Sequence, residues 1–316
     1  MKPPSIIALI STLMTLFAAP AWPGTALVGN ENGASISLID TERDEVIGEI
    51  KTGGKPRGTA IDARRGIAYV SDQAANGLLV IDIAKRLVLK RIELGESPEG
   101  VYISPDGKLV AAAVELSNSV AFIDTARDEV AFRVKIRGEN PEHAVFSPDG
   151  RFVYVGAEED DKLEVIDVAN RKLIAQLQVG TRPRGITFTP DGAKAYVACE
   201  RADAVYVIDA REHRILRSIK AGQRSNGLTM HPSGKTVYLT NGGDGTVMAI
   251  DTATDTVTAT IKVGARPWNM AITKDGGKLY VANGRSNSVS VIDTLKNVRL
   301  KDVPVGNAPW GVQILD

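Results

Sequence analysis

Residues 180–209 read GTRPRGITFTPDGAKAYVACERADAVYVID, and near-copies of this stretch fill most of the chain. An aspartate that closes a VID-like triplet recurs seven times, in steps of 42 or 43 residues, as Asp40, Asp82, Asp124, Asp167, Asp209, Asp251 and Asp293. A second marker repeats with the same steps, as Pro56, Pro98, Pro141, Pro183, Ser225, Pro267 and Pro309. Each copy carries four short runs rich in β-forming residues. A period in the forties with four strands per copy is typical of a β-propeller, in which each copy forms one blade.

The two ends of the repeat region indicate how the ring closes. The first copy begins at its second strand, residues 26–28, and lacks the innermost strand. Residues 311–316 have the sequence of that missing strand. We therefore expect an all-β, seven-bladed β-propeller of four-stranded blades, closed by the C-terminal strand joining the N-terminal blade.

The first residues have the pattern of a secretory signal. Lys2 precedes an apolar run over residues 6–17, and Ala19-Pro20-Ala21 fits an A-x-A cleavage site. The run is short for a membrane span. We expect residues 1–21 to be cleaved on export, which leaves residues 22–316 as a single propeller domain, periplasmic or otherwise exported, with no membrane span. Because Cys199 is the only cysteine, no disulfide within the chain is expected.

Charge is balanced over the whole chain but differs between the copies. Lys plus Arg and Asp plus Glu number 38 each, so no overall charge favours nucleic acid or a membrane surface. Basic and aromatic residues next to the recurrent proline should form an arc on one rim of the ring: Lys55, Arg57, Arg182, Arg184, Arg224, Arg266, Trp268 and Trp310. Acidic residues should form the opposite arc of that rim: Glu99, Glu115, Glu142, Glu158, Glu159, Asp160 and Asp161.

This rim has two interpretations. Guanidinium groups beside indole rings suit a planar carboxylated ligand, a nucleotide or single-stranded nucleic acid. Alternatively, Arg57 with Glu99 and Arg184 with Glu142 form ion pairs between blades, and the tryptophans pack the mouth of the channel.

One group of residues on the rim has side chains suited to a metal or to acid–base chemistry: Glu99, Glu142 and His143. No H-x-H, C-x-x-C or HExxH spacing strengthens this hypothesis. No glycine-rich loop follows a strand and opens a helix, so the sequence contains no phosphate- or dinucleotide-binding cofactor motif. The scattered Ser, His and Asp residues do not indicate a catalytic triad.

Four second-strand sequences carry a family resemblance. Residues 69–72 read YVSD, residues 196–199 YVAC, residues 238–241 YLTN and residues 280–283 YVAN, each followed by a VID-like strand. They resemble the repeats of YVTN-family β-propellers, and the whole chain is most similar to the propeller proteins associated with pyrroloquinoline quinone (PQQ)-dependent alcohol catabolism. The resemblance implies an exported companion of quinoprotein dehydrogenase or transport components, and it assigns no catalysis. The chain departs from the repeat at Ser225, and at His143 and Asn269, which replace a glycine.

We therefore expect a non-catalytic periplasmic binding or accessory propeller that presents its Arg and Trp rim to an anionic aromatic ligand or a partner protein. PQQ is a candidate ligand because it is planar and multiply anionic. Single-stranded nucleic-acid binding at the same rim is one alternative, although the acidic arc would repel a long polyanion. A lactonase-like propeller hydrolase is the other, and it would need Glu99, Glu142 and His143 at the channel mouth.

Overall fold

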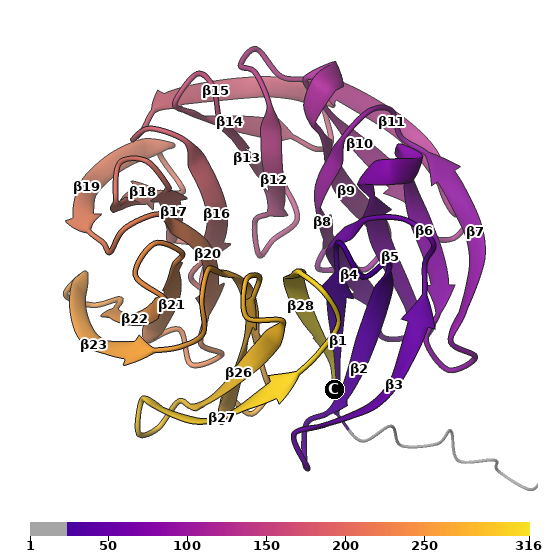
Figure 1. The fold of residues 1–316 in the computed structure, drawn as a ribbon. Helices are drawn as coiled ribbons and strands as arrows, with labels where there is room; N and C mark the ends of the chain where they lie inside the picture. Colours follow the sequence, from indigo (N-terminus) through magenta and orange to yellow (C-terminus); the bar gives the residue numbers. More distant parts are fainter. Residues whose placement is uncertain (1–23) are drawn as a thin grey trace, which may run out of the picture.

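The computed structural model describes residues 24–316, so the predicted signal peptide over residues 1–21 lies outside the described residues. Seven four-stranded sheets follow one another around a central axis (Figure 1), and neighbouring strands within each sheet are antiparallel. The helical elements of this region are two single 3₁₀ turns, η1 (Gln73–Ala75) and η2 (Glu115–Ser117). No helix among these residues is long and apolar enough to cross a membrane. The prediction of an all-β, seven-bladed propeller is confirmed.

Six blades take four consecutive strands each, ordered from the axis outward. They are β4 (Pro56–Asp62), β5 (Ile67–Asp72), β6 (Gly77–Asp82) and β7 (Leu87–Glu93); β8 (Pro98–Ile103), β9 (Leu109–Val114), β10 (Ser119–Asp124) and β11 (Glu129–Lys135); β12 (Pro141–Phe146), β13 (Phe152–Ala157), β14 (Lys162–Asp167) and β15 (Lys172–Gln178); β16 (Pro183–Phe188), β17 (Lys194–Cys199), β18 (Ala204–Asp209) and β19 (Arg214–Lys220); β20 (Ser225–Met230), β21 (Thr236–Asn241), β22 (Thr246–Asp251) and β23 (Thr256–Lys262); β24 (Pro267–Ile272), β25 (Lys278–Asn283), β26 (Ser288–Asp293) and β27 (Val298–Pro304).

The seventh blade closes the ring with strands from both ends of the described chain. β28 (Pro309–Leu315) lies innermost, followed by β1 (Thr25–Asn30), β2 (Ser35–Asp40) and β3 (Glu45–Lys51). β28 and β1 pair antiparallel, with Leu27 opposite Gln313 and Val28 opposite Val312. In Figure 1 the yellow β28 lies beside the indigo β1. The predicted closure is confirmed, and it removes the open sheet edge that an unclosed ring would expose.

Burial depends on the position of a strand in its blade. The second and third strands are buried along most of their length, as in β5 and β6, whereas the outermost strand β7 is mainly exposed. Apolar side chains of adjacent blades share one cluster, as Val80 of one blade and Val114 of the next do. The apolar core is therefore a series of layers between blades, so each blade depends on its two neighbours for stability.

The recurrent aspartates are structural. Oδ1 of Asp209 accepts hydrogen bonds from the backbone N–H groups of Arg211 and Glu212. Equivalent bonds occur at Asp40, Asp124 and Asp251. They close the turn that follows the third strand, as expected of an Asx turn.

A tyrosine in the second strand connects most blades to the next one. The Tyr196 hydroxyl donates to Oδ1 of Asp255 at 2.7 Å, and Lys194 lies 3.0 Å from the same oxygen. We call each tyrosine with its turn acceptor an inter-blade clamp. The other four clamps are Tyr69 with Asp128, Tyr154 with His213, Tyr238 with Asn297 and Tyr280 with Asp44.

At two of the seven blade junctions there is no clamp, and both the tyrosine and the turn residue are replaced. Leu27 and Ala111 replace the tyrosine, and Arg86 and Arg171 stand in the turns where the acceptors would be. The turn residue has a positive φ in every blade: Asp44, Arg86, Asp128, Arg171, His213, Asp255 and Asn297. The backbone conformation of the turn is thus the same around the ring, while its side chain varies from blade to blade.

Candidate functional site

The residues that follow the recurrent proline position meet at one end of the axial channel. Every innermost strand begins at that position, so the next residues surround the axis at the same level. We call this set the axial mouth: Arg57, Glu99, Glu142, His143, Arg184, Asn226, Trp268, Asn269 and Trp310. Neighbouring inner strands approach closely here, since a Cβ on Gly58 would lie 2.5 Å from the carbonyl oxygen of Glu99. The glycine two residues after the proline position provides this space in most blades.

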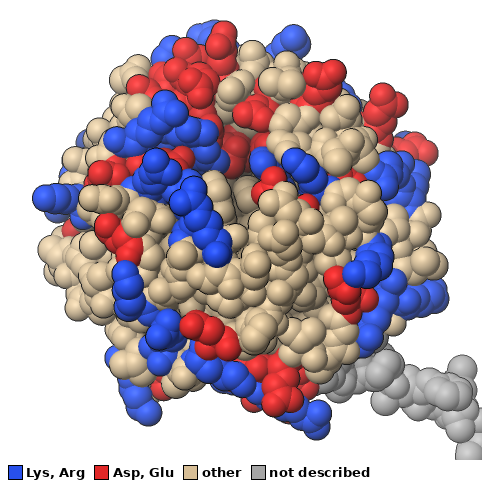
Figure 2. Space-filling model, viewed as in Figure 1, with Lys and Arg blue, Asp and Glu red and all other residues tan. Residues whose placement is uncertain are grey.

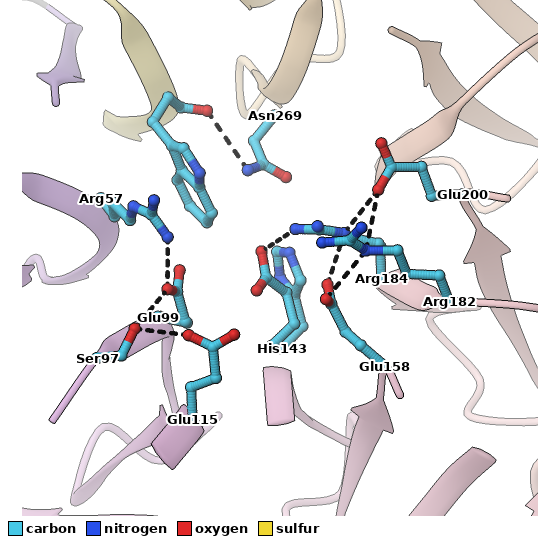
Figure 3. A network of polar contacts seen from close by, with 12 residues as sticks. Arg57, Ser97, Glu99, Glu115, His143, Glu158, Arg182, Arg184, Glu200 and Asn269 are labelled. Atoms are coloured by element: carbon cyan, nitrogen blue, oxygen red, sulfur yellow. Dashed lines mark hydrogen bonds and ion pairs between the residues drawn. The ribbon is translucent and has the colours of Figure 1, made fainter. Parts of the chain in front are cut away.

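Arg184 lies at the centre of a buried ion-pair network. Its Nη1 is 2.5 Å from Oε1 of Glu142, and its Nε is 2.6 Å from Oε1 of Glu158 and 3.1 Å from Oε2 of Glu200. Arg182 pairs with Glu158 at 3.0 Å. Figure 3 shows these side chains converging from adjacent blades. Several guanidinium and carboxylate groups thus share partners, so the loss of one affects the others.

The remaining arginines of the rim extend this network. Arg57 pairs with Glu99 of the next blade, and with Glu31 at 3.0 Å. Arg266 pairs with Glu200 at 2.7 Å. The predicted ion pairs of Arg57 with Glu99 and of Arg184 with Glu142 are therefore confirmed.

The separation of the rim into a basic and an acidic arc is wrong. Carboxylates already neutralise Arg57, Arg182, Arg184 and Arg266, because the two predicted arcs interlock. Figure 2 shows positive and negative side chains next to one another around the central hollow. Lys55 and Arg224 are exposed, and neither forms an ion pair with any residue from 24 to 316. The acidic loop residues Asp160 and Asp161 accept hydrogen bonds from the backbone N–H groups of Glu139 and Arg182.

The sequence reasoning missed Glu31 and Glu200, although the repeat contains the signal. The position directly after the second strand reads Glu31, Gln73, Glu115, Glu158, Glu200, Gly242 and Gly284 around the ring. A Cβ on Gly242 would lie 2.7 Å from Nη1 of Arg266, and one on Gly284 would lie 2.5 Å from Cδ1 of Trp268. Three of these glutamates, Glu31, Glu158 and Glu200, pair with arginines, whereas Glu115 accepts from Ser97. Glycines occupy the position where Arg266 and Trp268 need space.

Burial sets the protonation of the network. It raises the pKa of Glu158 to about 8, and the negative charge of Glu142 acts in the same direction. Burial and Glu142 likewise raise the pKa of Glu99 well above its ordinary value. Burial also opposes ionisation of Glu142 and Glu200, but Arg184 and the other positive groups nearby together outweigh it, so the pKa values of both carboxyl groups fall. At neutral pH the network therefore combines ionised and protonated carboxyl groups.

His143 and the tryptophans form the aromatic part of the mouth. His143 Nδ1 lies 2.5 Å from the Tyr102 hydroxyl, and its ring stacks on Trp310 with 5.9 Å between centroids and 13° between planes. Burial lowers the pKa of His143 to about 4, so the ring is neutral at physiological pH. Trp310 is only 5% exposed. Trp268 is half-buried beneath the Arg266 guanidinium, which lies 4.1 Å from its ring centre. Trp310 therefore packs the mouth, while Trp268 and Arg266 form a cation–π pair.

Glu99, Glu142 and His143 lie at the same mouth but serve other contacts. Glu99 and Glu142 pair with Arg57 and Arg184, and His143 bonds to Tyr102. Across residues 24–316 no group of three His, Cys, Asp or Glu side chains is placed to hold a metal ion. The geometry therefore gives the metal hypothesis no support.

A cavity of about 240 Å³ lies on the axis among the innermost strands. Its lining is uncharged and includes hydroxyl and amide side chains: Tyr102, Thr187, Thr229, Asn269 and Gln313. Trp310 lines it as well, which connects the cavity to the His143 stack. The charged network and the uncharged cavity are therefore adjacent but chemically distinct.

Comparison with known proteins places the repeat in a family. The sequence matches the family described as "Lactonase, 7-bladed beta-propeller" over residues 90–178 and 169–301. No curated protein matches the chain significantly.

Two solved structures illustrate the similarity of fold. Hydrazine synthase of Kuenenia stuttgartiensis superimposes with a TM-score of 0.79 at 22% identity, over 90% of this chain and 99% of that one. A functionally unknown protein of Desulfotomaculum acetoxidans DSM 771 superimposes with a TM-score of 0.80 at 19% identity, over 92% of this chain and 98% of that one. At this level of identity the similarity concerns the fold alone.

Proposed function

The chain belongs to the seven-bladed β-propeller lactonase family. From this premise we propose that it is a non-catalytic binding or accessory propeller whose ligand site is the axial mouth. The observation that carries the proposal is a group of buried polar atoms with no hydrogen-bond partner between residues 24 and 316: Arg57 Nε, Glu99 Oε2, His143 Nε2, Asn226 Nδ2 and Arg266 Nη1. Buried polar atoms are nearly always hydrogen-bonded. Their concentration at one mouth supports a place where another molecule completes the bonding.

The rim outside the ion-pair network supports an anionic aromatic ligand. Arg224 and Lys55 are exposed cations there, and beside them Arg266, which belongs to the network through Glu200, lies over the half-buried Trp268. Such groups suit carboxylates on a planar ring system. PQQ has this chemistry, and it is the ligand that we would test first.

The cellular setting is part of the same proposal. The signal-like pattern of residues 1–21 and the resemblance to PQQ-associated propellers support an exported, periplasmic protein. Its partners would then be quinoprotein dehydrogenase or transport components of alcohol catabolism.

Tryptophan fluorescence tests the ligand. We expect saturable quenching on titration with PQQ at micromolar concentration. Affinity should fall in Arg224→Ala and Arg266→Ala variants and stay unchanged in Arg211→Ala, an exposed arginine in the turn after β18. The absence of a saturable signal up to high micromolar PQQ would exclude PQQ as the ligand.

One alternative has an observation in its favour. Family membership favours a lactonase-like hydrolase, which predicts acid release from a simple lactone in a pH-stat assay. That rate should then disappear in Glu142→Gln and His143→Ala variants. Binding of single-stranded nucleic acid is less well supported, because carboxylates neutralise most of the arginines that it would need.

A further inference from the structure

The guanidinium groups at the axial mouth present hydrogen-bond donors without acceptors. Arg57 Nε and Arg266 Nη1 are buried and have no partner in residues 24–316. A guanidinium N–H can only donate. Both groups therefore lack an acceptor atom.

His143 also presents a donor. The Tyr102 hydroxyl has His143 Nδ1 as its hydrogen-bond partner, at 2.5 Å. We assign Nδ1 as the acceptor, because the neutral phenol has one proton to donate and Nδ1 is its hydrogen-bond partner. In the neutral ring the proton then lies on Nε2, and this buried atom has no partner in the described part of the chain. His143 is 1% exposed, so its Nε2–H group is held within the mouth.

Glu99 fits the same pattern. Its Oε1 accepts from Arg57 and, at 3.0 Å, from Gln73. Burial favours the protonated form of this carboxyl, as its raised pKa indicates. Its Oε2 has no partner among residues 24–316, so this carboxyl group also presents an unsatisfied buried polar atom. Arg57, Glu99 and His143 come from three consecutive blades, and Figure 3 shows them around the same opening.

These donors lie in surroundings of little net charge. Glu31 and Glu99 flank Arg57, and Glu142 with its partner Arg184 lies beside the neutral His143. The adjacent axial cavity of about 240 Å³ has no charged residue in its lining. A carboxylate placed here would meet donors but would also face the ionised Glu142. An uncharged acceptor oxygen would gain the same hydrogen bonds without that repulsion.

We infer that the axial mouth binds an uncharged carbonyl group of a ligand of the ketone, quinone or ester class. The Nε2–H group of His143 donates to the carbonyl oxygen, and the part of the ligand that carries it lies in the axial cavity beside Trp310. This inference rests on the proposed binding function and specifies its chemistry at the axis. It is compatible with anionic groups of the same ligand reaching Arg224 or Lys55 at the rim.

Three small aromatic probes of similar size test the inference: acetophenone, 1-phenylethanol and benzoate. Tryptophan fluorescence reports binding, because Trp310 lines the cavity and stacks on His143. We expect acetophenone to bind at least tenfold more tightly than benzoate, with 1-phenylethanol between them. Proton-detected ¹⁵N spectra of the histidine rings provide a second readout, in which the His143 Nε2–H resonance should be present without ligand and shift on adding acetophenone.

Substitutions of His143 distinguish the loss of its N–H donor from the loss of its packing. His143→Leu should weaken acetophenone binding at least tenfold, whereas His143→Gln, which retains a side-chain N–H donor, should restore most of it. His213→Gln is the matched control, because His213 also bonds to a tyrosine hydroxyl, at 2.7 Å, but at the clamp of Tyr154. If His143→Leu fails to fold, Tyr102→Phe should still weaken binding, because it releases the bond that fixes the tautomer.

The outcomes distinguish this inference from the proposed function. Tighter binding of benzoate than of acetophenone, or undiminished acetophenone binding in His143→Leu, overturns the carbonyl assignment and leaves the binding function intact. If none of the probes or PQQ binds and the His143 resonance does not move, both proposals fail. A His143 ring protonated on Nδ1 would also overturn the inference, since Nε2 would then be an acceptor.

Discussion

At the scale of single residues, Arg184 is the position on which the buried network depends. It is almost fully buried and contacts Glu142, Glu158 and Glu200, all of them buried. Replacing one partner of a buried ionic group is costly because it leaves uncompensated charge. We expect Arg184→Met to reduce the free energy of unfolding by about 3–5 kcal/mol. Urea unfolding followed by circular dichroism measures this loss.

The control for Arg184 is Arg224, on the inner edge of the next blade. Arg224 is exposed, so Arg224→Met should change stability by no more than about 0.5 kcal/mol. A loss of less than about 1 kcal/mol in Arg184→Met would show that the carboxyl groups take up protons instead of remaining charged.

The same carboxyl groups predict a pH dependence of stability. The pKa of Glu158 is raised from 4.5 to about 8, so between these values the unfolded state has released a proton that the folded state keeps. Stability contributed by this group is complete below pH 4.5 and is lost as pH rises toward 8. His143 acts in the opposite direction, because its pKa is lowered from 6.5 to about 4 and its contribution is lost only as pH falls below 6.5. Above pH 6.5 the contribution of His143 to stability is constant, so the change in stability there reports the carboxyl group alone.

Between pH 6.5 and 8 we expect the free energy of unfolding to fall by up to about 1.4 kcal/mol per pH unit for each such carboxyl group. Denaturant titrations at closely spaced pH values measure the slope. Glu158→Gln should flatten it, whereas Glu159→Gln, its exposed neighbour, should not. A slope that Glu158→Gln leaves unchanged would place the proton on another group.

Aligning the copies predicted part of the axial mouth. The residue after the proline position identified Arg57, Arg184, Trp268 and Trp310, and it offered the correct ion pairs as one of two interpretations. It could not show which interpretation holds, because ion pairing depends on the directions of the side chains. It also depends on Glu200, which follows the second strand of its blade and not the proline position. The neutral state of His143 was equally out of reach, since it follows from burial against Tyr102 and Trp310.

At the scale of elements, the inter-blade clamps explain why turn residues differ from copy to copy. A tyrosine bonds to an acceptor of the next blade at five positions around the ring. At the other two, Leu27 and Ala111 replace the tyrosine, and Arg86 and Arg171 replace the acceptor; Arg86 donates to Ile47 O and Arg171 lies over the Phe132 ring. The charged clamps also carry a cation, as Lys194 does at Asp255 and Lys278 does at Asp44. Sequence reasoning identified these tyrosines as repeat markers only, because their partners lie in the next blade.

The clamps differ in the charge of their acceptor, which predicts different energies. Tyr196 donates to the carboxylate of Asp255, whereas Tyr238 donates to the amide of Asn297 at 3.1 Å. Hydrogen bonds to charged groups contribute about 1.5–3 kcal/mol, compared with about 0.5–1.5 kcal/mol for neutral pairs. We expect Tyr196→Phe to destabilise the protein more than Tyr238→Phe in urea unfolding. Equal losses would show that ring packing, and not the hydroxyl, accounts for the effect of both substitutions.

At the scale of the whole molecule, the repeat spacing was sufficient to predict the ring and its closure. Blade number, strand order and the pairing of residues 311–316 with the first blade all follow from the register of two markers. The spacing could not predict the chemistry of the mouth, which arises when closure brings distant residues together. Tyr280 and Asp44 illustrate this, because they are 236 positions apart and become neighbours only in the closed ring.

Circular permutation tests whether backbone pairing in the seventh blade stabilises the ring. Gly24 and Asp316 lie close together, since a Cβ on Gly24 would be 2.8 Å from Asp316 Oδ1, so a short glycine linker can join them. New termini at Asp149 and Gly150, in the turn between β12 and β13, create another blade that combines both ends of the chain. New termini at Gly53 and Gly54, between β3 and β4, leave every blade continuous and close the ring without strand pairing between the two ends of the chain.

Closure through strand pairing adds backbone hydrogen bonds between the two ends of the chain, which packing alone does not provide. The permutant opened at Gly53 should therefore melt lower than the one opened at Asp149, which should resemble the native order. A difference on the order of 2 kcal/mol corresponds to about 4–8 °C for a domain of this kind. Scanning calorimetry of both permutants with the same linker measures it. Equal melting temperatures would mean that the layers between blades, such as the cluster containing Val80 and Val114, hold the ring closed without the paired ends.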